Sequence, residues 1–226
     1  MKKPIPALLL SASLAVLSLG CGSNNGTVEP VAGTAEIQVA HLSPDAGPVD
    51  IWLDGAVVLP SVPFEAISGY LPIDAGDHRV QVTPAGQTSP IVIDAVLGFT
   101  EGTATTVAAT GLLGAMDVQA IVLADDRNAG SQVQVRFVHA SPDAPPVDVA
   151  LTGGPVLIPD TAFREASGYT TVAGGTYDLE VRVAGTQDVA LSLPGTVLTN
   201  GTNITVFAIG ELRDSSLGAL VTVDAP

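Results

Sequence analysis

Apolar and polar residues alternate with a period of two in short runs along most of the chain, and turn residues separate these runs. Such alternation predicts half-buried β-strands, because successive side chains of a strand point to opposite faces. Asp54-Gly55 between two of the runs is a strong β-hairpin signal. In the first half of the chain, the predicted strands cover residues 36–40, 49–53, 56–59, 67–73, 79–82, 91–96, 103–109 and 118–123.

The second half of the chain repeats the first. From His41 to Gly55 and from His139 to Gly153, ten of 15 positions are identical, whereas unrelated segments would share about one. The pattern Phe-x-x-x-Ser-Gly-Tyr occurs at residues 64–70 and again at 163–169. This internal repeat indicates a duplicated structural unit.

The repeat and the strands together predict the fold class. We expect an all-β protein made of two tandem immunoglobulin-like or transthyretin-like β-sandwich domains of about seven strands each. The first copy spans residues 34–126, the second spans 132–226, and residues 127–131 form the linker. The 24 glycines and 17 prolines along the chain disfavour long helices.

The N-terminus reads as an export signal. Lys2 and Lys3 precede an apolar stretch over residues 5–19, which has the length of a signal-peptide core and is short for a membrane span. We therefore assign residues 1–20 to a signal peptide. Residues 21–33 are small and polar, as in a flexible tether.

Cys21 is the only cysteine, and it directly follows this stretch. The sequence before it resembles a bacterial lipobox, although Ser18 and Leu19 stand where Leu and then Ala or Ser are usual. We expect Cys21 to be lipidated, the alternative being a plain secretory signal with an incidental cysteine. Gly22 rather than Asp after the cysteine favours the outer membrane over the inner membrane of the bacterial cell envelope.

Charge limits the partners of the mature chain. Without residues 1–20 it has six arginines and no lysine against 23 acidic residues, which gives a net charge of −17. Such a surface repels phosphate backbones, so we expect no nucleic-acid partner. It also disfavours flat binding to anionic lipid, which leaves the lipid anchor to hold the protein at the membrane.

Residues 135–149 contain the run His-x-Ser-Pro-Asp-Ala-x-x-Val-Asp, which resembles the signature of the domain-of-unknown-function 4397 (DUF4397) family. A Tyr-x-x-Val-x-x-Gly segment follows at residues 169–175, and the first copy keeps the run with Gly47 in place of a common proline. The resemblance covers both copies. It implies secretion, tandem β domains and no established activity, and it supplies no catalytic residues.

The repeated run is the main candidate for chemistry, and we interpret it as a structural turn. Proline presets φ, while serine and aspartate side chains bond nearby backbone N–H groups. A metal site is the alternative, with His139, Asp143 and Asp148 as ligands, and their counterparts in the first copy as a twin site. Neither a calcium loop nor a zinc site fits this spacing well. The turn residues are His41, Ser43, Pro44, Asp45, Asp50, His139, Ser141, Pro142, Asp143 and Asp148.

Catalysis has weaker support. A Ser-His-Asp triad cannot easily form from three residues within five positions, and no Gly-x-Ser-x-Gly motif is present. Tyr70 and Tyr169 either contact a ligand or pack their rings and bond their hydroxyls to backbone. We expect no catalytic, metal or cofactor residues.

These observations favour a non-enzymatic envelope lipoprotein that serves as a binding, adhesion or spacer module. Its expected partner is another envelope protein or a cell-wall or surface glycan. A purely structural stalk and a Ca²⁺- or metal-dependent surface adhesion module remain as alternatives.

Overall fold

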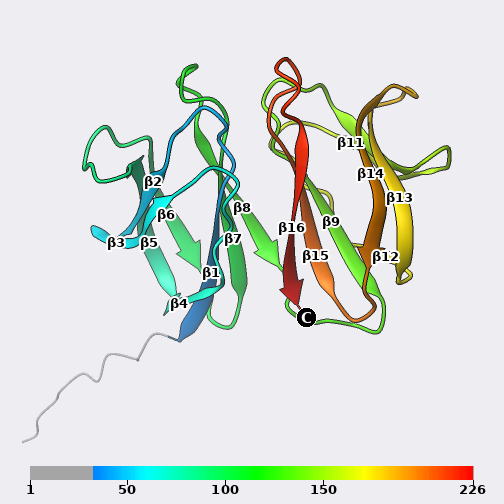
Figure 1. Cartoon of the computed structure of the whole chain (residues 1–226). Helices are drawn as coiled ribbons and strands as arrows, with labels where there is room; N and C mark the ends of the chain where they lie inside the picture. Colours follow the sequence, from blue (N-terminus) through cyan, green and yellow to red (C-terminus); the bar gives the residue numbers. More distant parts are fainter. Residues whose placement is uncertain (1–32, 226) are drawn as a thin grey trace, which may run out of the picture. The chain divides into compact units, whose positions relative to one another are not determined.

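The computed structural model describes residues 33–225, and Cys21 and the predicted signal peptide lie outside them. These residues form sixteen β-strands, eight in each copy (Figure 1). No helix that could cross a membrane occurs in this part of the chain. The strands of the first copy are β1 (Thr34–His41), β2 (Val49–Leu53), β3 (Ala56–Val62), β4 (Leu71–Asp74), β5 (Gly76–Pro84), β6 (Ile93–Phe99), β7 (Ala104–Thr110) and β8 (Gln119–Asp125). Those of the second copy are β9 (Val133–His139), β10 (Val147–Leu151), β11 (Val156–Thr161), β12 (Thr170–Val172), β13 (Gly175–Val183), β14 (Val189–Leu198), β15 (Asn203–Ile209) and β16 (Gly218–Ala225).

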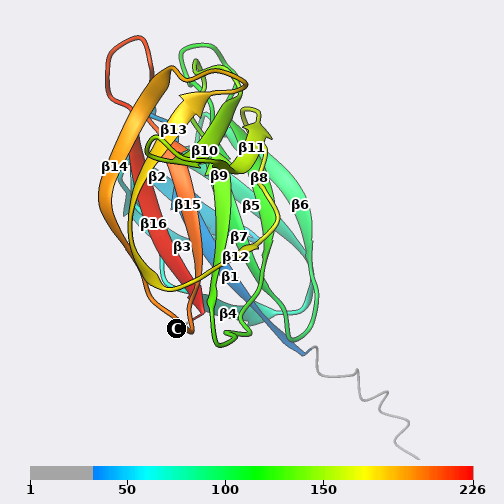
Figure 2. The ribbon, with the colours of Figure 1, turned by 90° about the vertical axis from the view of Figure 1, so that its right-hand side faces the viewer.

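Each copy is a sandwich of two four-stranded sheets, which confirms the predicted fold class. The sheets of copy 1 have the orders β4-β1-β7-β8 and β3-β2-β5-β6, and copy 2 repeats both orders as β12-β9-β15-β16 and β11-β10-β13-β14. Figure 2 shows the same strands from the side. The order differs from that of a constant-type immunoglobulin domain, where the first, second, fifth and fourth strands share one sheet.

The first strand of each copy lies between an antiparallel and a parallel neighbour. β1 pairs antiparallel with β4 and parallel with β7, and Ile37 lies opposite both Leu71 and Thr105. β9 has the same two relations, to β12 and β15. Antiparallel hairpins connect β2 to β3 and β5 to β6 in the other sheet.

Each strand predicted for copy 1 corresponds to an observed strand, although the ends shift: β5 covers Gly76–Pro84 rather than 79–82, and β6 covers Ile93–Phe99 rather than 91–96. The strand expected over residues 67–73 begins only at Leu71. Ile67 forms a single bridge to Ala40, because the Ser68 hydroxyl accepts the Val39 N–H at 2.9 Å and takes the place of a backbone partner there.

The inner faces of the two sheets form the core of each copy. In copy 1 the core is one cluster, with Val39, Ile51, Val82 and Phe99 among its members. In copy 2 the same space contains two smaller clusters.

A further apolar cluster joins the two copies, which lie within one compact unit. Its members come from the outer faces of the sheets that contain β1 and β9. Copy 1 contributes Ala40, Leu42, Ala108 and Leu123, and copy 2 contributes Val138, Ala140, Phe207 and Ile209. The C-terminal halves of β1 and β9 are therefore buried on both faces.

Candidate functional site

The repeated His-x-Ser-Pro-Asp run connects β1 to β2 and, in copy 2, β9 to β10. Its histidines, His41 and His139, end the strands and have buried rings. In each copy Nε2–H donates to a backbone carbonyl six residues later, that of Gly47 or Pro145, at 3.1 Å. Burial lowers the pKa of both imidazoles, which favours their neutral form.

The first aspartate of the run binds a distant loop. Asp45 accepts the backbone N–H groups of Leu113 and Gly114 at 2.6 and 2.7 Å. Asp143 does the same with two N–H groups of the β15–β16 loop, at 2.7 and 3.0 Å. From the sequence we expected partners within the turn itself. The partners instead lie 68 to 70 residues further along the chain.

The last aspartate of the run binds two other backbone segments. The buried Asp50 accepts the N–H of Ser61 at 2.7 Å and that of Gly86 at 2.8 Å. Ser61 has a φ of 53°, where the β2–β3 pairing shifts register. Asp148 makes both bonds again in copy 2, at 2.7 and 2.9 Å. This carboxylate thus supports an irregular strand and the β5–β6 turn together.

The serine and proline of the run differ in how well they repeat. Pro44 and Pro142 begin the expected turns. The Ser43 hydroxyl donates to the Gly111 carbonyl at 2.7 Å. The buried Ser141 hydroxyl has no hydrogen-bond partner among residues 33–225.

The aspartates and histidines of the run bond to backbone groups. All four aspartates accept backbone N–H groups, and the histidines bond to carbonyls rather than to the aspartates. Residues 33–225 contain no group of three His, Cys, Asp or Glu side chains arranged to hold a metal ion. These backbone hydrogen bonds hold loops to strands, which is a structural role.

A second cluster, which the sequence did not reveal, lies between the copies. Arg136 of β9 is 4% exposed, and its Nη2 lies 2.6 Å from Oδ1 of Asp125 of copy 1, whose side chain is fully buried. The same guanidinium donates to the Ala124 carbonyl and to the Thr205 hydroxyl, at 2.8 and 2.9 Å. Buried charges need such complete pairing, because removal of one partner leaves the other unsolvated.

The two tyrosines belong to this cluster. Tyr70 donates its hydroxyl to Asp125 at 3.0 Å, and Tyr169 donates to Asp224 at 2.7 Å. Burial raises the pKa of both hydroxyls and also that of Asp224. The tyrosines are thus bonded to carboxylates rather than to backbone.

The cluster repeats between the copies except at its centre. Tyr, Thr and Asp recur at a constant offset of 99 residues, a signal that could have identified them from the sequence. Gln38 occupies in β1 the place that Arg136 has in β9, and it donates to the Ser68 carbonyl at 3.0 Å. The Arg136 guanidinium therefore pairs with two carboxylates. Its Nη2 lies 2.6 Å from Oδ1 of Asp125 and 3.9 Å from Oδ2 of Asp224.

Arg164 forms a second polar bridge between the copies. Its Nε donates to the Thr110 hydroxyl at 3.2 Å, and its Nη2 lies 3.2 Å from the Asp117 carboxylate. The interface between the copies, called the joint below, therefore combines the apolar cluster with the directional bonds of Arg136 and Arg164.

Comparison with known proteins gives a family but no activity. The family model described as "Domain of unknown function (DUF4397)" matches residues 35–150 and 133–226, in agreement with the resemblance of the repeated run. No curated protein matches the chain. Among solved structures, a family CBM26 module from Eubacterium rectale Amy13K, in complex with maltoheptaose, is 11% identical. That alignment covers 85% of this chain and 98% of the module with a TM-score of 0.25, which is too low to support an argument about function.

Proposed function

The chain belongs to the DUF4397 family, whose description names no activity. From this premise we propose that the protein is a non-enzymatic lipoprotein of the cell envelope. In this proposal the two sandwiches act as one rigid binding or spacing module. The lipidated Cys21 holds the module at the outer membrane, and residues 21–33 tether it. Its partner is an envelope protein or a cell-wall or surface glycan.

The observation that supports rigidity is the joint between the copies. Eight apolar residues from the two outer sheet faces share one cluster. The Arg136–Asp125 ion pair is buried beside this cluster, and a buried charged pair favours one geometry over others. Two domains on a flexible linker need neither feature. A module whose copies keep one orientation presents its loops at fixed positions, as a spacer or a two-site binder requires.

Distance measurements between spin labels test this rigidity. In residues 22–226, Thr88→Cys and Gln187→Cys place one label on an exposed turn of each copy. The proposal expects one narrow distance distribution, similar in width to that of a Gln187→Cys and Val197→Cys pair within copy 2. A distribution much broader than this control would show that the copies move independently and would refute the rigid module.

Membrane fractionation tests the anchor. Cys21→Ser should release the protein from the membrane fraction and abolish acyl labelling. Leu19→Ala, which brings the residues before the cysteine closer to the usual lipobox, should keep both. Membrane retention of Cys21→Ser, with no acyl label on the wild type, contradicts the anchor.

A capture experiment separates a binder from a stalk. The soluble form, residues 22–226, is passed through an envelope extract and over purified cell-wall glycan. Saturable retention of one component supports a binding module. A stalk without a specific partner retains neither.

A further inference from the structure

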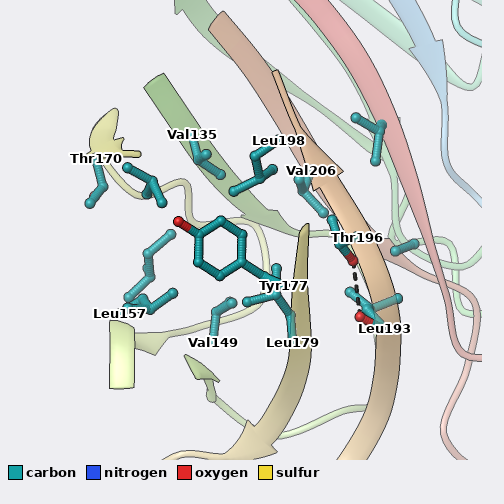
Figure 3. Close-up of a pocket in the computed structure, with 14 residues that line it drawn as sticks. Val135, Val149, Leu157, Thr170, Tyr177, Leu179, Leu193, Thr196, Leu198 and Val206 are labelled. Atoms are coloured by element: carbon teal, nitrogen blue, oxygen red, sulfur yellow. Dashed lines mark hydrogen bonds between the residues drawn. The ribbon is translucent and has the colours of Figure 1, made fainter. Parts of the chain in front are cut away.

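The interior of copy 2 contains a cavity of about 150 Å³ between its two sheets (Figure 3). Fourteen residues line it, and all but Thr170, Tyr177 and Thr196 are aliphatic. The cavity also reaches Val221, which is 56% exposed on the edge strand β16. An apolar space inside the sandwich therefore has an approach from solvent along this edge.

The polar groups of the wall are largely occupied. The Thr196 hydroxyl donates to the Leu193 carbonyl and the Tyr177 hydroxyl to the Ala173 carbonyl, both at 2.9 Å. A buried water needs two to four polar partners, and apolar cavities of about 150 Å³ can stay dry and bind benzene. The wall of this cavity suits an apolar occupant better than water.

Copy 1 has a hollow against the equivalents of many of these residues, but larger side chains fill the β6 side of its core. Strand pairing matches Leu198 and Thr196 of β14 with Phe99 and Leu97 of β6, because each pair faces the same positions of the preceding strand. Phe99 is 3% exposed, and its ring lies 5.9 Å from that of His78. The hollow of copy 1 has a volume of about 270 Å³. All of its lining residues belong to β1–β5, and none belongs to β6. Smaller side chains in β14 therefore extend the hollow of copy 2 into its core.

We propose that copy 2 binds a small uncharged apolar molecule between its sheets, either a single aromatic ring or an alkyl group of similar volume. The space accommodates a molecule about the size of benzene. No charged side chain lines it, so an ionic headgroup has no partner inside. This inference rests on the binding role proposed above, but it concerns occupancy of one cavity. It can fail while the joint and the anchor hold.

Benzene titration of residues 22–226, followed by methyl NMR, tests the site. Saturable shifts should appear for the methyl groups of Leu179, Leu198 and Val206, and the melting temperature should rise with benzene. Absence of saturable shifts at benzene saturation overturns the proposal.

Cavity-filling variants copy residues that copy 1 already has. Leu198→Phe should remain folded, melt at or above the wild-type temperature, and bind benzene at least tenfold more weakly. Thr196→Leu is a second variant with the same expectation should Leu198→Phe not fold. The matched control, Phe99→Leu in copy 1, should keep the shifts in copy 2. Unchanged affinity in a folded filling variant, or shifts confined to the hollow of copy 1, contradicts a site in copy 2.

Discussion

The two copies fill the outer face of their β2-containing and β10-containing sheets in different ways. In copy 1, Trp52 donates its indole N–H to the Thr83 hydroxyl at 2.9 Å. In copy 2, the same two positions hold Ala150 and Arg182. The Arg182 guanidinium is buried, donates to Glu180 at 2.5 Å, and donates to the Leu151 carbonyl at 3.0 Å. A large side chain and a small one have exchanged places across neighbouring strands.

Other positions do not exchange. Asp50 and Asp148, on the same face, make the same pair of backbone bonds in both copies. A packing volume can come from either of two strands, whereas an unpaired backbone N–H needs an acceptor at one point in space. The comparison teaches that the identity of Asp50 and Asp148 follows their backbone hydrogen bonds, whereas the packing positions of Trp52 and Thr83 diverge as a compensating pair.

The largest effect is expected at the centre of the joint. Arg136→Ala leaves Asp125 buried without its cation and should lower the free energy of unfolding by about 3–5 kcal/mol. Gln38→Ala, at the equivalent place in copy 1, removes neutral bonds only and should cost about 1 kcal/mol. Urea denaturation of both variants provides the measurement. Equal losses would mean that the charge at this place does not distinguish the copies.

The exchanged pair can be tested by giving copy 1 the residues that copy 2 has at the same positions. Trp52→Ala removes a large, partly buried side chain and should cost about 2–3 kcal/mol. Addition of Gln81→Glu and Thr83→Arg reproduces the arrangement of copy 2 and should recover at least about 1 kcal/mol. The same two substitutions in the wild-type background serve as the control. No recovery in the triple variant would mean that the two arrangements are not interchangeable.

The repeated run should respond alike in both copies. Asp143→Ala and Asp45→Ala each free two backbone N–H groups and should cost about 0.5–2 kcal/mol. Because the carboxylates bind backbone, this loss should be the same with Ca²⁺, Zn²⁺ or EDTA. Thermal melting decides between this role and a metal site. A wild-type melting temperature that rises with metal, and a variant that has lost the rise, would support the metal reading.

The smallest expected effect is a change in how stability depends on pH. It comes from His78, which has no histidine counterpart in copy 2. A hydrogen bond to Asp54 raises the pKa of His78, so its contribution to stability is present below the unfolded pKa of about 6.5 and is lost as pH rises through the folded pKa. The buried His41 and His139 have lowered pKa values, so their contribution is present above about 6.5 and is lost as pH falls.

Copy 2 has Tyr177 in place of His78, which makes His78→Tyr the natural variant. Urea midpoints between pH 5 and 8 should show that this variant loses the part of wild-type stability that declines with rising pH. The decline on acidification from His41 and His139 should persist. Parallel pH curves for the wild type and the variant would argue against the Asp54–His78 bond.

Alternation and turn residues were sufficient to predict the sandwich, since both act over a few neighbouring residues. The joint between the copies left no such signal. Ala40 lies on the outer face of β1 and Leu42 directly follows the strand, and a strand buried on both faces loses the contrast on which alternation depends. Arg136 and Asp125 lie on opposite sides of the predicted linker, and no local pattern marks them as partners.

The partners of Asp45 and Asp143 were hidden for a different reason. A turn motif predicts bonds to its own backbone, whereas these carboxylates bind loops that only the strand order brings close. The repeat showed that the aspartates matter in both copies. It could not show which backbone they hold.

The parallel pairing of β1 with β7 also sets the order in which the fold can form. Ile37 lies opposite Thr105, 68 residues later, so this contact has a high loop-closure cost. Sandwiches dominated by such distant pairings fold over about milliseconds to seconds, far more slowly than helical bundles. As each copy emerges from synthesis, its first strand must wait for the seventh before it gains its parallel neighbour. Until that moment β1 exposes one unpaired edge, and the nascent copy is vulnerable to mispairing there.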